Sequence, residues 1–249
     1  RSPQHHRTWY KHWVLCLWPR LPTPALAHGQ FLLRNHYASL DPAIRGWMSD
    51  APSYLPPIPL GAPVRATTIG VIAESANPDY PVGAWATGLN AIEDYSLCEG
   101  NGFTRVVDAN AVPKVTNYLS AAGTIGLTAY FALLDLGRPV AGETVLVSGA
   151  AGAVGSVVGQ IAKMKGCRAI GVAGGPAKCE RLTRDYGYDA AIDYRGKSEA
   201  DLVREIRGAA PGGIDIHFEN VGGPVLNARG EVVGVVSYIS VEGRAEPSA

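Results

Sequence analysis

A glycine-rich turn between a predicted strand and a predicted helix restricts the fold of this chain more than any other feature. Residues 145–163 read VLVSGAAGAVGSVVGQIAK, in which an apolar run leads to Gly149, Gly152 and Gly155 at three-residue spacing. The residues that follow place apolar side chains at i, i+3, i+4, i+7 and i+8, which predicts an amphipathic helix. Spaced glycines before a helix let the backbone approach a bound anion, because the start of the helix offers free N–H groups. The alternative is a turn whose glycines serve packing alone.

Strands and helices alternate through the second half of the chain, and this pattern predicts a parallel, doubly wound α/β sheet. The predicted strands are 144–150, 168–174, 190–194, 214–223 and 231–239, and the predicted helices are 153–166, 177–187 and 199–208. A long apolar segment at 116–137 precedes them and is expected to be helical, with Gly137 as its end. Only residues 221–230 separate the last two predicted strands, which is short for a parallel crossover.

The first half of the chain has a different pattern. Short β-like runs alternate with turns rich in Pro and Gly, which indicates a β-rich, partly barrel-like domain. These runs are 12–18, 30–37, 69–75 and 103–109. The sequence therefore predicts two domains, a β-rich one over 1–115 and a dinucleotide-binding one over 116–249.

The charge balance argues against a nucleic-acid or membrane partner. Lys and Arg total 22, as do Asp and Glu, and the sequence has no basic stripe. No apolar stretch approaches the length of a membrane span. The cysteines are far apart and form no CxxC pair, which is typical neither of a disulfide framework nor of a zinc finger; they are Cys16, Cys98, Cys167 and Cys179. A reducing compartment, and with it a cytoplasmic location, is therefore expected.

The end of the second predicted strand bears on the choice of cofactor. An NAD site usually has Asp or Glu there to bind the ribose hydroxyls. This chain has Gly174 and Gly175 instead, with Lys178 soon after and Tyr194 at the end of the third strand. A missing acid beside a cation favours a 2′-phosphate, and so NADP. The alternative is that Lys178 is an ordinary solvated residue of a first helical turn.

Hydride transfer is the chemistry that such a cofactor brings. Zinc-dependent dehydrogenases with two such domains need Cys and His ligands in the first domain, where this chain has only Cys16 and Cys98. No metal site is therefore predicted. The YxxxK pair of short-chain carbonyl reductases is also absent. The remaining option is reduction of a C=C bond next to a carbonyl, in which Tyr or water protonates the enolate.

Several motifs in this order resemble the zinc-independent medium-chain dehydrogenases/reductases. The similar group is that of prostaglandin reductase, leukotriene B4 12-hydroxydehydrogenase and NADP-dependent alkenal double-bond reductase, and the motifs lie at 35–48, 54–61, 126–137, 147–167 and 218–223. The resemblance implies a GroES-like domain followed by a Rossmann domain, with NADP(H) as cofactor. It also implies an enone or alkenal as the small-molecule substrate, and a possible homodimer.

The resemblance also assigns roles to individual residues. It implies pyrophosphate contacts at Gly152, Ala153, Val154 and Gly155, next to Gly149 of the same glycine pattern. It implies 2′-phosphate contacts at Lys178 and Tyr194. It implies further cofactor contacts at Asn220 and, near the nicotinamide, at Thr128. Tyr37 and Tyr238 are the candidate catalytic residues. An alternative interpretation makes Tyr37 a packed core aromatic.

Three departures from the family pattern leave other functions open. Tyr238 lies out of register with the tyrosine of the family, and Thr68 or Ile69 stands where the family has a second pocket tyrosine. The last family strands have no counterpart before residue 249, so we expect a chain truncated at its C-terminus. The alternatives are a quinone reductase of the same superfamily and an NADP-binding remnant without activity.

Overall fold

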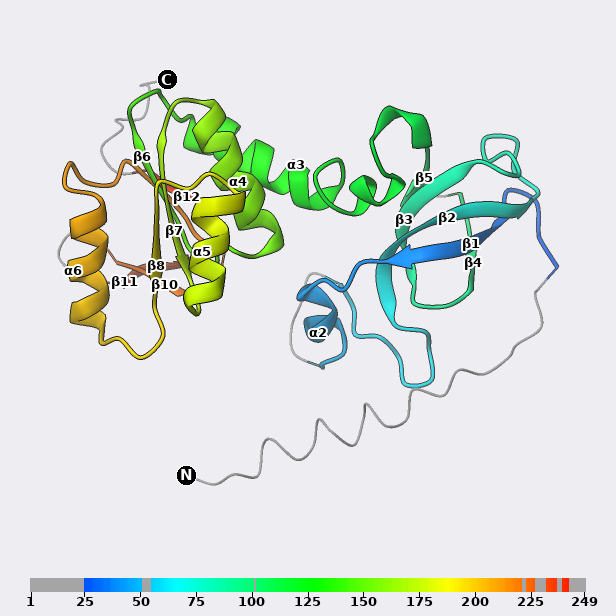
Figure 1. The fold of residues 1–249 in the computed structure, drawn as a ribbon. Helices are drawn as coiled ribbons and strands as arrows, with labels where there is room; N and C mark the ends of the chain where they lie inside the picture. The colour runs from blue at the N-terminus through cyan, green and yellow to red at the C-terminus, as the bar shows by residue number, and fades with distance from the viewer. Residues whose placement is uncertain are drawn as a thin grey trace, which may run out of the picture.

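The computed structural model describes residues 25–50, 55–100 and 102–220, together with the backbone of three strands within 223–241. Figure 1 shows two lobes joined by the segment that contains helix α3. The first lobe is built on a five-stranded antiparallel sheet, and the second on a five-stranded, mainly parallel sheet with helices packed on it. This arrangement confirms the predicted fold class, a β-rich GroES-like part followed by a Rossmann-type part.

The first lobe contains strands that the sequence pattern missed. Its sheet has the order β4-β1-β2-β3-β5 and consists of β1 (Phe31–Ala38), β2 (Arg65–Ser75), β3 (Trp85–Ala91), β4 (Tyr95–Cys98) and β5 (Thr104–Val107), beside the short helix α2 (Ala43–Trp47). β3 and β4 were not predicted. β3 is rich in small residues, and at Gly88 a Cβ would collide with the backbone of Phe103 and Thr104, so that the small residue is what lets β5 approach.

The segment that joins the lobes is not one helix over 116–137. It consists of a 3₁₀ turn η3 (Val115–Leu119), the α-helix α3 (Thr124–Phe131) and a π-helical end η4 (Ala132–Gly137). The chain turns back on itself before α3, where a Cβ at Gly123 would collide with the carbonyl of Tyr118. η3 packs against β2 of the first lobe and α3 packs against α4 of the second, so the boundary at residue 115 stays a prediction.

The second lobe has the predicted alternation of strands and helices. Its sheet has the order β12-β9-β6-β7-β8 and consists of β6 (Thr144–Val147), β7 (Arg168–Ala173), β8 (Ala190–Asp193), β9 (Ile216–Phe218) and β12 (Ile239–Val241). The helices are α4 (Ala153–Met164), α5 (Pro176–Asp185) and α6 (Glu199–Ala209). β6 pairs in parallel with both β7 and β9, and β7 with β8, so the glycine-rich turn lies at the carboxyl end of the central strand.

The prediction of a fifth parallel strand over 231–239 was wrong. Strands β10 (Gly223–Leu226) and β11 (Val232–Val236) pair with each other in an antiparallel hairpin, and β12 pairs antiparallel with β9. The predicted fourth strand, 214–223, is correspondingly short, because only β9 belongs to the sheet. Residues 221–230 are too few for a parallel crossover, and they instead contain β10, the first strand of the hairpin.

Tyr188 packs helix α4 against the rest of the second lobe. Its side chain is buried, and its hydroxyl donates a hydrogen bond of 2.7 Å to the carbonyl of Gly155. The ring occupies the space beside Gly159, where a Cβ would collide with it. Burial raises the pKa of the Tyr188 phenol above its usual value, so the hydroxyl stays protonated and remains a donor at physiological pH.

We predict that Leu182→Ala strongly destabilises the second lobe. Leu182 is fully buried among the side chains between α5, β7 and Tyr188, so its truncation leaves a cavity. The expected loss is about 2–5 kcal/mol in the free energy of unfolding, measured by urea denaturation. The matched control is Leu136→Ala, whose side chain is 63% exposed and which should change stability by no more than about 0.5 kcal/mol. Equal effects of the two substitutions would contradict this core.

Candidate functional site

The glycine-rich turn, residues 148–153, presents backbone rather than side chains at the end of β6. Gly149 has a φ of +53°, a left-handed conformation that favours glycine. Gly152 is the N-cap of α4, and no side chain caps the helix. Its own N–H donates to the carbonyl of Gly149 at 2.8 Å, which closes the turn. The first N–H groups of α4 and the positive end of its dipole therefore form an anion-binding position.

Gly155 holds the helix close to the strand. A Cβ at this position would lie 2.7 Å from both the Cα of Ala150 and the carbonyl oxygen of Gly149, closer than a side chain can be. The predicted pyrophosphate residues, which include Ala153 and Val154, thus lie together in one turn and one helical start. The contact also explains why glycine stands at the third position of the pattern, where its role is to pack the helix.

The end of β7 carries no acidic side chain and lies beside cationic ones. Gly174 and Gly175 follow the strand, and Lys178 lies in the first turn of α5. The Tyr194 hydroxyl lies 2.8 Å from the place where a Cβ of Gly174 would be, and Arg195 Nη1 lies 3.1 Å from the corresponding place at Gly175. Tyr194 is 53% exposed, so its hydroxyl is accessible. The structure therefore brings Tyr194 to the end of β7, as predicted, and adds Arg195.

Asp193 is the acidic residue next to this position, and one oxygen of its carboxylate binds the backbone of the adjacent loop. One oxygen accepts N–H bonds from Gly175 at 2.7 Å and from Arg195 at 3.0 Å. The Arg195 N–H, followed by that of Gly175, lowers the pKa of Asp193, so it is ionised at neutral pH. Asp193 and Arg195 were not predicted. The signal for both was their place at and just after the end of a predicted parallel strand.

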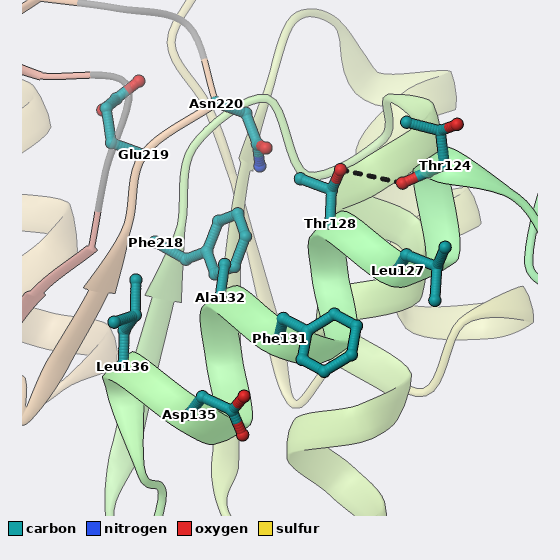
Figure 2. A pocket seen from close by; sticks show the side chains of 10 residues that line it. All are labelled: Thr124, Leu127, Thr128, Phe131, Ala132, Asp135, Leu136, Phe218, Glu219 and Asn220. Carbon is teal, nitrogen blue, oxygen red and sulfur yellow. Dashed lines mark hydrogen bonds between the residues drawn. The ribbon is translucent and has the colours of Figure 1, made fainter. Parts of the chain in front are cut away.

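A hollow of about 670 Å³ lies between α3, η4 and the end of β9 (Figure 2). Apolar side chains form much of its lining, among them Leu127, Phe131 and Phe218. Thr128 and Asn220, both predicted as cofactor contacts, add polar groups to the lining, and their contact with a cofactor stays a prediction. Thr128 Oγ1 donates to the carbonyl of Thr124 at 2.8 Å. The hollow can therefore take a flat, largely apolar group with a polar edge.

A hydrogen-bond network connects the ends of β6 and β9. Ser148 Oγ donates to Glu219 Oε1 at 2.7 Å and accepts the backbone N–H of Asn220 at 2.8 Å. The side-chain Nδ2 of Asn220 donates to the carbonyl of Ser148 at 2.9 Å. Ser148 and Glu219 were not predicted, because the predicted strands 144–150 and 214–223 ran past them; in the structure both directly follow parallel strands, where sites of this fold class form.

His217 lies next to this network but is not predicted to do acid–base chemistry. Its Nε2 is 3.4 Å from Glu219 Oε2. Burial lowers the pKa of the imidazole, and the Glu219 carboxylate opposes that shift. The net direction of the pKa shift is downward, so His217 is neutral at pH 7.

Of the two candidate catalytic tyrosines, the structure describes only Tyr37, which is not part of this edge. Tyr37 lies near the end of β1 in the first lobe and is 50% exposed, which rules out the alternative of a packed core aromatic. Tyr238 lies outside the described residues. The structure thus gathers the predicted cofactor residues in the second lobe, and the catalytic assignment stays a prediction.

The described residues contain neither a candidate metal site nor a candidate membrane span. Within the described ranges, no three His, Cys, Asp or Glu side chains are grouped so that they could hold a metal ion. Cys98, Cys167 and Cys179 are free thiols. Of the helices in the described part of the chain, none is both long and apolar enough to span a bilayer.

Two protein families match the two halves of the chain. Residues 19–106 match a family described as the N-terminal domain of oxidoreductase, and residues 153–235 match one described as zinc-binding dehydrogenase. The matches fall on the two lobes seen in the structure.

Individual proteins are also similar. An NADPH-dependent curcumin reductase of Escherichia coli is 44% identical over 80% of this chain and 56% of its own length. A putative NADP-dependent oxidoreductase of Bacillus subtilis is 40% identical, over 91% and 68%, and mouse prostaglandin reductase 1 is 39% identical, over 82% and 60%. The crystal structure of CurA from Vibrio vulnificus in complex with NADPH has a TM-score of 0.75 at 39% identity, over 82% of this chain and 59% of that one. The chain thus spans just over half to two thirds of these proteins.

We predict that Gly155→Ala destabilises the protein, whereas Gly208→Ala does not. The methyl group at position 155 must displace the backbone of the glycine-rich turn, at a cost of about 1–3 kcal/mol. At Gly208, in α6, a Cβ has no atom within 4 Å, so alanine should stabilise the helix by about 0.5–1 kcal/mol. Urea unfolding of both variants measures the difference. A stability of Gly155→Ala equal to the wild type would show that the turn is not tightly packed.

Proposed function

Since the chain belongs to the medium-chain dehydrogenase/reductase family, in the group that includes curcumin and prostaglandin reductases, we propose that it binds NADPH and reduces a C=C bond next to a carbonyl. The observation that carries the proposal is one sheet edge with three parts. An uncapped glycine-rich turn lies at its centre, cations lie at the end of β7, and an apolar hollow lies beside β9.

The residues at this edge fit a dinucleotide phosphate. The pyrophosphate would lie on the N–H groups of Ala153, Val154 and Gly155, where the glycine-rich turn leaves room for it. The 2′-phosphate would lie near Lys178 and the end of β7. β7 is followed by Gly174 and Gly175 rather than by the acidic side chain of an NAD-type site, and the carboxylate that reaches this loop is that of Asp193, from β8.

Tyr194 and Arg195 would complete the 2′-phosphate position. The guanidinium of Arg195 can bind a phosphate through two parallel N–H bonds, and the Tyr194 hydroxyl can donate a third. Asp193 holds the backbone of this loop through the N–H groups of Gly175 and Arg195.

NADPH, when bound, supplies the hydride for the reduction. The part of this chain that would surround the reacting ring is the hollow, where Leu127, Phe131 and Phe218 offer apolar surface and Thr128 and Asn220 offer polar contacts. Tyr37, half-exposed on β1, is the candidate that delivers a proton to the reduced substrate, with Tyr238 as the second candidate. The proposal assigns no metal to the reaction, since the first half of the chain has only two cysteines.

We predict that the protein binds NADPH more tightly than NADH, and that Arg195→Ala reduces this preference. The loss of a charge-assisted hydrogen bond to the 2′-phosphate should raise the Kd for NADPH about tenfold and change that for NADH by no more than about twofold. Arg207→Ala, on the exposed last turn of α6, is the matched control and should change neither. Calorimetry measures both constants. Equal affinities of the wild type for NADPH and NADH would refute the assignment of the 2′-phosphate position.

The second prediction concerns the reaction. With a conjugated enone the wild type should consume NADPH, and Tyr37→Phe should lower kcat about a hundredfold without changing the Kd for NADPH, because only a proton donor is lost. Tyr95→Phe, at a tyrosine of the same lobe that is 45% exposed, is the control. Consumption with a quinone but not with an enone would favour the quinone reductase. Tight NADPH binding without consumption by either would favour the remnant.

A further inference from the structure

Ser148 makes four hydrogen bonds to three consecutive residues at the end of β9. They join its N–H, its carbonyl and both functions of its hydroxyl to Phe218, the last residue of β9, and to Glu219 and Asn220, which follow it, at distances of 2.7–3.0 Å. We propose that Ser148, together with Glu219, is a positioning residue that fixes which end of the Asn220 amide faces the hollow. The site would then offer Asn220 Oδ1 as an acceptor for the carboxamide N–H of a nicotinamide ring. This inference rests on the proposed function.

The direction of the Ser148 hydroxyl follows from the chemistry of its partners. A backbone N–H can only donate, so the N–H of Asn220 requires a lone pair of Ser148 Oγ. A carboxylate can only accept, so the Ser148 hydroxyl donates its hydrogen bond to Glu219 Oε1. Glu219 therefore turns the proton of Ser148 away from Asn220 and makes the oxygen available to it.

The orientation of the Asn220 amide follows in the same way. The carbonyl of Ser148 can only accept, so the side chain of Asn220 must direct Nδ2 toward it, at 2.9 Å. Oδ1 is then the atom that the amide presents on its other side. Figure 2 shows the Asn220 amide directed into the hollow, on the side of Thr128. A flipped amide would place two acceptors against each other and is excluded.

An acceptor at this point selects a ligand group that donates. The nicotinamide ring carries a carboxamide, whose N–H groups are its strong donors, and a bond from one of them to Oδ1 would fix the rotation of the ring in the apolar hollow. Without Ser148 Oγ, the backbone N–H of Asn220 and the carboxylate of Glu219 lose their common partner. The backbone of Asn220 would then be held less firmly beside the Ser148 carbonyl, which still sets the direction of the amide, so that placing Oδ1 for the bond would carry an entropic cost.

The experiment compares two ligands that differ only at this end. One is NADPH, and the other is 2′-phospho-ADP-ribose, which lacks the nicotinamide. In Ser148→Ala the Kd for NADPH should rise about five- to tenfold, and that for 2′-phospho-ADP-ribose should change by no more than about twofold. Ser148→Thr retains the hydroxyl and should restore NADPH binding. Thr183→Ala, which removes a hydroxyl bonded only locally within α5, is the control and should leave both constants unchanged.

A second measurement needs no ligand. Hydrogen exchange of the backbone N–H of Asn220 should be faster in ligand-free Ser148→Ala than in the wild type, and slow again in Ser148→Thr. Equal weakening of both ligands in Ser148→Ala would make Ser148 merely structural and overturn the inference, as would unchanged NADPH binding with faster exchange. Failure of the wild type to bind either ligand would overturn the proposed function itself, and with it this inference.

Discussion

The close approach of α4 to β6 and β7 is the constraint on which the second lobe depends. Gly155 touches the backbone of Ala150, Gly159 accommodates the ring of Tyr188, and Gly171 packs against Ala150 and Leu182. Any side chain at these glycines would push the helix off the sheet. Because the helix is held so close, its N-terminus lies next to the end of β6, and the glycine-rich turn that connects them is tightly packed.

The sequence predicted those elements that carry their own signal. The strands and helices from 144 to 209 were recovered because a parallel sheet with covering helices produces long apolar runs and amphipathic periods. β3 and β4 were not predicted because their stability comes from cross-strand pairing, and the small residues of β3 have little strand propensity of their own. The helix predicted over 116–137 was broken by the packing of Gly123 against Tyr118, a contact that no local pattern reveals.

The candidate site divides in the same way. The glycine-rich turn, Lys178 and Tyr194 were found because spacing along the chain defines them. Arg195, Ser148 and Glu219 were missed because their significance comes from neighbours across the sheet, at positions such as Gly174 and Asn220 that are distant in sequence. The general rule that polar residues at the carboxyl ends of parallel strands converge would have singled out all three.

At the edge formed by these strand ends, the groups that would contact the cofactor differ in how rigidly they are held. Backbone N–H groups at the glycine-rich turn are fixed by packing, whereas Lys178 and Arg195 reach their positions on long, flexible stems. Between these extremes, Asn220 is a side chain whose amide is held by backbone partners. An amide that can bond in either of two directions gains specificity only when something fixes its direction, and here the adjacent parallel strand does so through Ser148. The pairing of β6 with β9 thus does more than extend the sheet, since it places Ser148 beside Asn220 and so determines which polar atom faces the hollow.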